Sequence, residues 1–153
     1  MKRVCVCIVI AALLLCLTAC GGGKDVDLEG LAADLTASGA FTEDMNQYAA
    51  APGVAQGLYR YEDGDMEQCI LYCNATSGEE IFLAKTSGED VAETMENACH
   101  DRVTNQIAWL ENYAPDAVPR LENAIVLRQG NYVIFVVAND AAAAQSIVDG
   151  YVK

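Results

Sequence analysis

Four residues in the second half of the chain have side chains that could bind a ligand or a buried charge: Arg102, Gln106, Trp109 and Tyr113. Their spacing of three or four residues places them along one side of an α-helix. A guanidinium binds carboxylates and phosphates through paired hydrogen bonds, and aromatic rings commonly line ligand pockets. These residues therefore form the candidate site of the chain.

Arg102 and Gln106 interrupt an otherwise apolar stripe, and a buried guanidinium without a partner has a large desolvation cost. The favoured interpretation is a structural network in which Arg102 pairs with a carboxylate or strand-end carbonyls and Gln106 completes the set. The alternative is a small anionic-ligand site at the open end of a helix–sheet interface. There Arg102 would hold the anion, and Trp109 and Tyr113 would form a wall.

The element that positions these residues is a long amphipathic helix predicted between Ser87 and Pro115. Ser87 is the expected N-cap, with Asp90 three residues later, and Pro115 ends the helix because the residue before a proline avoids helical geometry. Steps of about 100° per residue place one set of side chains on a single stripe: Val91, Met95, Ala98, Cys99, Arg102, Gln106, Trp109, Leu110 and Tyr113.

Two predicted hairpins flank this helix, with strands at residues 66–74 and 79–86 before it and at 121–128 and 132–138 after it. A short helix is expected within residues 26–38, and a final helix is expected to begin after an Asn139 or Asp140 cap. The sequence therefore predicts an α+β fold, a mostly antiparallel four-stranded sheet from two hairpins, packed on one long central helix with shorter terminal helices. Residues 132–137 are apolar on both faces, which predicts a central strand and a covered second face.

The stretch between the first helix and the first hairpin has a weaker pattern. Pro52 and Gly53 break residues 41–61, which are predicted to be irregular with Leu58, Tyr59 and Tyr61 as core contacts. The acidic run at residues 62–65 is predicted to be a turn, since it lacks the glycine and glutamate spacing of a calcium-binding loop.

The N-terminus has the pattern of a secretory signal, in which Lys2 and Arg3 precede a short apolar run and then small residues. The sequence Leu17-Thr18-Ala19-Cys20-Gly21 resembles the lipobox of bacterial lipoproteins, where the cysteine thiol receives a diacylglycerol and the bond before it is cut. Several acyl chains, such as palmitate, give stable anchoring. The alternative is an ordinary signal peptide or a short anchor with a chance cysteine.

The predicted domain organisation follows from this N-terminus. Residues 1–19 form a lipoprotein signal peptide, residues 20–40 hold the lipidated Cys20, a flexible glycine tether and a short helix, and residues 41–153 form a single α+β domain. The predicted localisation is the extracytoplasmic face of the cell membrane, with lipid on Cys20 as the contact to the bilayer.

The charge balance excludes some partner classes. Cleavage after Ala19 removes Lys2 and Arg3 and leaves seven basic against 22 acidic residues, a formal charge of −15. Such a charge disfavours binding to nucleic acid and to anionic wall polymers. It is typical of a solvated surface and is compatible with basic partners.

No catalytic or metal-binding constellation is recognisable. Cys69, Cys73 and Cys99 are expected to be buried free thiols, with a disulfide from Cys69 or Cys73 to Cys99 as the alternative. The spacing of these cysteines and His100 matches no zinc motif, and His100 is predicted to face water. We therefore expect no cofactor, no metal and no enzymatic activity.

Several short motifs occur in a distinctive order: residues 80–85 (Glu-Ile-Phe-Leu-Ala-Lys), Arg102-x3-Gln106, Tyr113-x-Pro115, Leu121-x-Asn123-Ala124 and residues 130–133 (Gly-Asn-Tyr-Val). Over roughly residues 41–148 this order resembles the domain of unknown function 4358 family, small lipoproteins of clostridia-like Gram-positive bacteria. The resemblance implies location and fold, and it supplies no catalytic residues. Cys69, Cys73 and Cys99 are not part of the family's pattern.

These observations together predict a membrane-anchored extracytoplasmic lipoprotein that acts as a non-enzymatic binding or interaction module of the cell envelope, with an envelope protein as its partner. The alternative functions are a small anionic-ligand binder that uses Arg102 and, less favoured, an enzyme. A concave pocket around Arg102 would favour the ligand binder, whereas an exposed apolar patch would favour the interaction module.

Overall fold

The computed structural model describes residues 25–51 and 53–153. The predicted signal peptide and the predicted lipidation site, Cys20, lie outside these described residues. Among the helices within them, none combines the length and the apolar character that crossing a bilayer requires.

Four antiparallel strands form one sheet in the order β1-β2-β4-β3. The strands are β1 (Met66–Cys73), β2 (Glu80–Thr86), β3 (Ile125–Gln129) and β4 (Tyr132–Val137). Both hairpins form as predicted, and β2 and β4 pair in the middle of the sheet. Every residue of β4 is buried, which explains why its sequence is apolar at consecutive positions rather than alternate ones.

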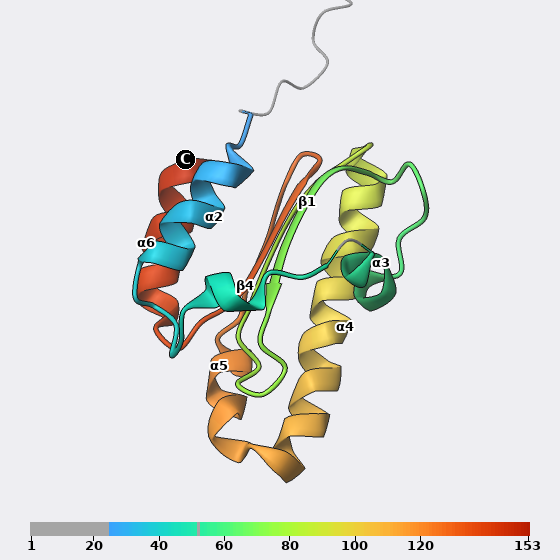
Figure 1. Cartoon of the computed structure of the whole chain (residues 1–153). Coiled ribbons are helices and arrows are strands. Elements are labelled where there is room, and N and C mark those ends of the chain that lie inside the picture. The colour runs from blue at the N-terminus through green and yellow to red at the C-terminus, as the bar shows by residue number, and fades with distance from the viewer. Residues whose placement is uncertain (1–24, 52) are drawn as a thin grey trace, which may run out of the picture.

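One face of the sheet is covered by the two terminal helices, α2 (Leu28–Ala37) and α6 (Ala141–Val152) (Figure 1). They pack with the 3-10 helix η1 (Met45–Tyr48) over inward-facing side chains of the two central strands, which are Ile81, Leu83, Ile134 and Val136. The Asp140 carboxylate accepts a hydrogen bond from the Ala143 N–H (3.0 Å) and caps α6. The predicted α+β fold with a covered second face is therefore confirmed.

The other face is covered mainly by α4 (Glu89–Tyr113), the long central helix that the sequence predicted. The short helices α3 (Val54–Tyr59), η2 (Pro115–Ala117) and α5 (Val118–Glu122) all contact it, and Figure 1 shows α3 beside α4. Met95, Cys99 and Leu110 of α4 are buried in this layer. Against them lie the alternate strand residues Phe82, Ala84, Val133 and Phe135.

The start of α4 differs from the prediction that Ser87 caps the helix. The N-cap is Gly88, in an extended conformation and without a side-chain cap. The Ser87 N–H donates to the Asp65 carbonyl (2.8 Å), and the Thr86 hydroxyl donates to the Gly88 carbonyl (2.8 Å). Ser87 is therefore still part of the connection that follows β2, which leaves the next residue to begin the helix.

Two further predictions were wrong in their details. Residues 121–124 do not begin a strand, because Leu121 lies in α5, where Pro119 occupies the first turn and suits helical φ. Residues 54–59 form α3 instead of an irregular segment, and Leu58 is exposed rather than a core contact.

Candidate functional site

A fully buried carboxylate, that of Glu80, lies between the end of the sheet where β2 begins and α4. Its two oxygens accept hydrogen bonds from three residues on two helices and from the Cys73 thiol of β1 (3.8 Å). The Tyr59 hydroxyl donates at 2.6 Å, Arg102 Nε donates to both oxygens at 2.8 Å, and Gln106 Nε2 donates at 3.2 Å. Arg102 Nη2 also lies 2.6 Å from Glu80 Oε2, which completes a paired guanidinium–carboxylate contact.

The local structure explains how these residues meet. Glu80 is the first residue of β2, and strand alternation points Glu80, Phe82 and Ala84 toward α4. Arg102 and Gln106 are one helical turn apart on α4, so both reach the same carboxylate.

Tyr59, the last residue of α3, holds that helix against the sheet. Its ring stacks on Phe82 with the centroids 3.8 Å apart and meets the edge of Phe135 at 6.4 Å. The Arg102 guanidinium carbon lies 5.7 Å from the centre of the Tyr59 ring. The hydroxyl and the ring face of Tyr59 therefore both contact the charged pair.

Burial and the Glu80 charge fix the protonation of the surrounding groups. Burial and then the negative charge of Glu80 raise the pKa of Tyr59 well above its usual value. The same two causes raise the pKa of Cys73 to about 11. Burial lowers the pKa of Arg102, but its hydrogen bonds and charge interaction with Glu80 outweigh that effect and raise it above the usual value. At neutral pH the network therefore contains one positive and one negative charge, a neutral phenol and a neutral thiol.

The structure brings two of the four candidate site residues to the Glu80 carboxylate, and a third, Trp109, lines an apolar hollow together with them. Arg102 and Gln106 share Glu80, whereas Trp109 and Tyr113 lie further along α4 on the surface, with their rings stacked 5.1 Å apart. The partners that the sequence did not identify are Glu80 and Tyr59. Glu80 carried one usable signal, namely that a charged residue directly precedes a run of four apolar residues in its strand.

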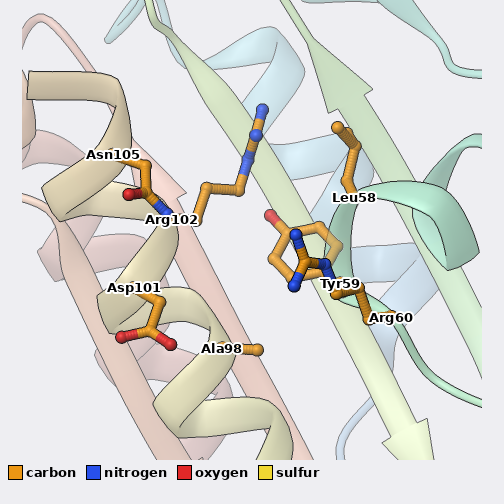
Figure 2. A pocket seen from close by; sticks show the side chains of 7 residues that line it. All are labelled: Leu58, Tyr59, Arg60, Ala98, Asp101, Arg102 and Asn105. Carbon is orange, nitrogen blue, oxygen red and sulfur yellow. The ribbon is translucent and has the colours of Figure 1, made fainter. Parts of the chain in front are cut away.

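A groove runs over this network between α3 and α4 and consists of two adjoining hollows that share Leu58, Arg102 and Asn105. The apolar hollow encloses about 460 Å³ and is also lined by Val54, Cys73, Ala75, Gln106, Trp109 and Leu110. The polar hollow encloses about 160 Å³ and is also lined by Tyr59, Arg60, Ala98 and Asp101. Figure 2 shows the polar hollow, with Asp101, Arg102 and Asn105 projecting from α4 and Leu58 and Arg60 on the α3 side.

The large apolar side chains that are exposed within the described residues gather at this groove. They are Val54 (41% exposed), Leu58 (37%), Trp109 (52%) and Tyr113 (73%). The first three line the apolar hollow, and Tyr113 extends it through its stack on Trp109. The groove is therefore an exposed apolar surface in a concave setting.

Of the remaining candidates, Cys73 borders the Glu80 network, where its sulfur accepts a hydrogen bond from Arg102 Nη2 (3.4 Å), and it lines the apolar hollow. Cys69, Cys73 and Cys99 are free thiols, and His100 is exposed on α4. In the part of the chain from Asp25 onward that the structure describes, no cluster of three or more metal-ligating side chains occurs.

The chain matches one family model, whose description is "Domain of unknown function (DUF4358)", over residues 41–138. The matched segment contains the whole sheet, α3, α4 and α5, and therefore the Glu80 network and the groove. No curated protein and no solved structure matches the chain.

Proposed function

Because the chain belongs to the DUF4358 family, which has no described activity, we propose a function from the groove itself. We propose that the protein is a lipid-anchored binding module of the cell envelope and that the groove between α3 and α4 binds a protein partner. The observation that carries this proposal is the gathering of exposed Val54, Leu58, Trp109 and Tyr113 at one concave surface.

The apolar residues account for the choice of a protein partner. Tryptophan and tyrosine are enriched at protein interfaces because they bury large areas with few rotatable bonds. The apolar hollow is large enough for one bulky side chain of a partner, and the stacked Trp109 and Tyr113 rings extend the contact area beyond it. The exposed Val54, Leu58, Trp109 and Tyr113 are not part of the buried core, so packing of the fold does not explain why they are apolar.

The Glu80 network argues against the alternative in which Arg102 binds a small anion. Its guanidinium already makes paired hydrogen bonds with a buried carboxylate, and its side chain is only 15% exposed. An anion would have to compete with Glu80 at close range or bind next to its negative charge. An activity based on Cys73 has a similar obstacle, because a thiol with a pKa near 11 is a weak nucleophile at neutral pH.

The position of Asp25, the first described residue, sets the orientation that a module anchored through Cys20 would have. Asp25 lies beside the start of α4, where it hydrogen-bonds to Tyr132 and pairs with Lys85. Cys20 is five residues earlier, so a lipid there would hold this end within about 17 Å of the bilayer. Trp109 lies 20 residues along α4 from Glu89, a distance of about 30 Å. The groove would therefore be presented away from the membrane, within reach of other envelope proteins.

We expect Cys20→Ala to move the protein out of the membrane fraction, because the acyl chains that anchor it cannot be attached. The measurement is mass spectrometry of the N-terminal peptide together with fractionation of cells that express either form. Cys69→Ala is the matched control and should remain in the membrane. A wild-type chain that is secreted without lipid would contradict the anchored part of the proposal.

The groove is tested by photo-crosslinking in intact cells, with benzoylphenylalanine in place of Leu58. We expect a defined crosslinked species that disappears when Val54→Asp is added, because the aspartate introduces a charge into the apolar hollow. The matched control carries the same crosslinker at Ala33, an exposed residue of α2 on the opposite side of the sheet. Equal crosslinking from both positions, or none from Leu58, would contradict a groove-specific partner.

A further inference from the structure

We propose that the groove recognises the free C-terminus of its partner, with the terminal carboxylate on Arg60 and the neighbouring apolar side chain in the apolar hollow. This inference deepens the proposed function and rests on the groove being the binding surface. It gives a binding role to Arg60, which takes no part in the Glu80 network.

Arg60 stands out among the basic residues of the described chain. Lys85, Arg102, Arg128 and Lys153 each make an ion pair, and Arg120 donates hydrogen bonds to Asn139 and to the Ser77 carbonyl. Arg60 is exposed, and its side chain makes neither kind of contact within residues 25–51 and 53–153. In a protein with a formal charge of −13, a guanidinium without an acidic partner is unusual.

The backbone of Arg60 strengthens the argument. Its φ is +55°, and it is the one residue other than glycine with positive φ in the described part of the chain. This conformation ends α3, and glycine or asparagine is preferred at such a position. An arginine is therefore present where the backbone favours a residue without a branched or long side chain, which indicates that the side chain itself has a use.

The neighbourhood of Arg60 fits a carboxylate beside an apolar group. Arg60 and Asn105 both line the polar hollow, where they can donate hydrogen bonds from opposite sides, one from the end of α3 and one from α4 (Figure 2). Asn105 and Leu58 also line the apolar hollow, so the two hollows adjoin directly. A ligand that fills both must carry an anion and an apolar group only a few bonds apart.

A chain terminus satisfies this requirement better than an acidic segment does. The terminal carboxylate and the side chain of the last residue are attached to the same Cα atom, which is the shortest separation that a polypeptide offers. An acidic segment would bring several negative charges toward a protein that is itself strongly acidic. A single terminal carboxylate brings only one negative charge into the polar hollow, which Asp101 also lines, and Arg60 and Asn105 supply the donors that offset the repulsion.

The experiment measures the fluorescence anisotropy of fluorescein-labelled peptides, Gly-Ser-Gly-Ser-Ala followed by Ala, Leu or Phe, added to the full chain in lipid nanodiscs. Each peptide is tested as the free acid and as the C-terminal amide. We expect the free acid with the better-fitting last residue to bind about tenfold more tightly than its amide, since charge-assisted hydrogen bonds give differences of this size.

Variants of Arg60 measure its contribution to peptide binding separately from that of the rest of the groove. Arg60→Gln should remove the preference for the free acid, whereas Arg60→Lys should retain part of it. Arg60→Gly should remove the preference as well, yet unfold at a higher temperature than the wild type because it relieves the positive φ. Arg128→Gln, a surface arginine paired with Glu96, is the matched control and should change nothing.

Two outcomes would overturn the inference and still be distinguishable from failure of the groove. Equal binding of acid and amide, abolished by Leu58→Asp, would leave the groove as a binding surface without carboxylate recognition. Absence of any peptide binding while crosslinking from Leu58 persists would show a partner that binds by an internal segment. Loss of both signals would overturn the proposed function together with the inference.

Discussion

Replacing Glu80 by glutamine is expected to lower the free energy of unfolding by about 3–5 kcal/mol, because it breaks a buried ion pair by removing one partner. Glutamine has nearly the same shape, so the change removes charge without leaving a cavity. The Arg102 guanidinium would stay between α4 and the sheet with its charge uncompensated, and the amide group would turn a donor toward donors on Tyr59, Arg102 and Gln106.

Urea denaturation of the wild type and of Glu80→Gln measures this effect as a shift of the midpoint at an unchanged slope. Glu96→Gln, which removes the partner of Arg128 in a pair whose side chains are 33% and 28% exposed, is the matched control and should cost less than about 1 kcal/mol. The double variant Glu80→Leu with Arg102→Met should recover most of the loss, since a buried pair can be exchanged for apolar side chains. A loss for Glu80→Gln no larger than the control's would show that the network contributes little to stability.

A second large effect is expected for Phe82→Ala, which should lower the free energy of unfolding by about 3–5 kcal/mol. Phe82 is fully buried in the central strand β2, and its ring is the platform on which Tyr59 stacks. Alanine would leave a cavity in the α4 layer and would remove the support that holds α3 beside the groove.

Thermal or urea denaturation gives the overall loss, and amide hydrogen exchange gives its location. We expect the amides of α3 to exchange faster in Phe82→Ala than in a variant of equal stability altered on the other face, such as Leu31→Ala. Tyr113→Ala is the surface control and should change stability by no more than about 0.5 kcal/mol, because its ring is largely exposed. Equal protection of α3 in both core variants would show that the Tyr59 stack does not hold the helix.

The parts of this structure that the sequence predicted are those with strong periodicity. The long helix and both hairpins follow from apolar spacing over many residues, and the doubly apolar run at 132–137 is the central strand β4. The physical need of Arg102 for a partner also predicted a buried network with Gln106. Desolvation cost is a local property of the residue type, so it could be inferred without knowing the fold.

The carboxylate that pairs with Arg102 could not be identified from the sequence, because its identity depends on which residue of β2 faces α4. Glu79 and Glu80 are adjacent, and the one-residue difference decides which face of the sheet each reaches. Glu80 turns toward Arg102, whereas Glu79 accepts hydrogen bonds from the backbone N–H and hydroxyl of Thr42 (2.8 Å and 2.5 Å). With 22 acidic residues in the chain, the position of Glu80 before an apolar run was not enough to identify it as the partner of Arg102.

The short helices were missed for a related reason. Residues 54–59 span less than two turns and contain Gly57, so local propensity alone does not favour α3. Its stability comes from Tyr59, which packs on the sheet and donates to Glu80. The groove depends on the position of this helix, and for that reason the sequence indicated Trp109 and Tyr113 without indicating Leu58 and Arg60 as their neighbours.

The face of the sheet that α2 and α6 cover sets the minimum length of a stable fragment. A recombinant fragment cut to residues 41–138 would keep all four strands and the groove but would lose α2 and α6. Of the covering helices, only η1 would remain over Ile81, Leu83, Ile134 and Val136, so much of this apolar surface would be exposed to water, and such fragments associate through that surface and precipitate. Expression, screening and biophysical work on this protein should therefore start from residue 25 or earlier and extend through Lys153.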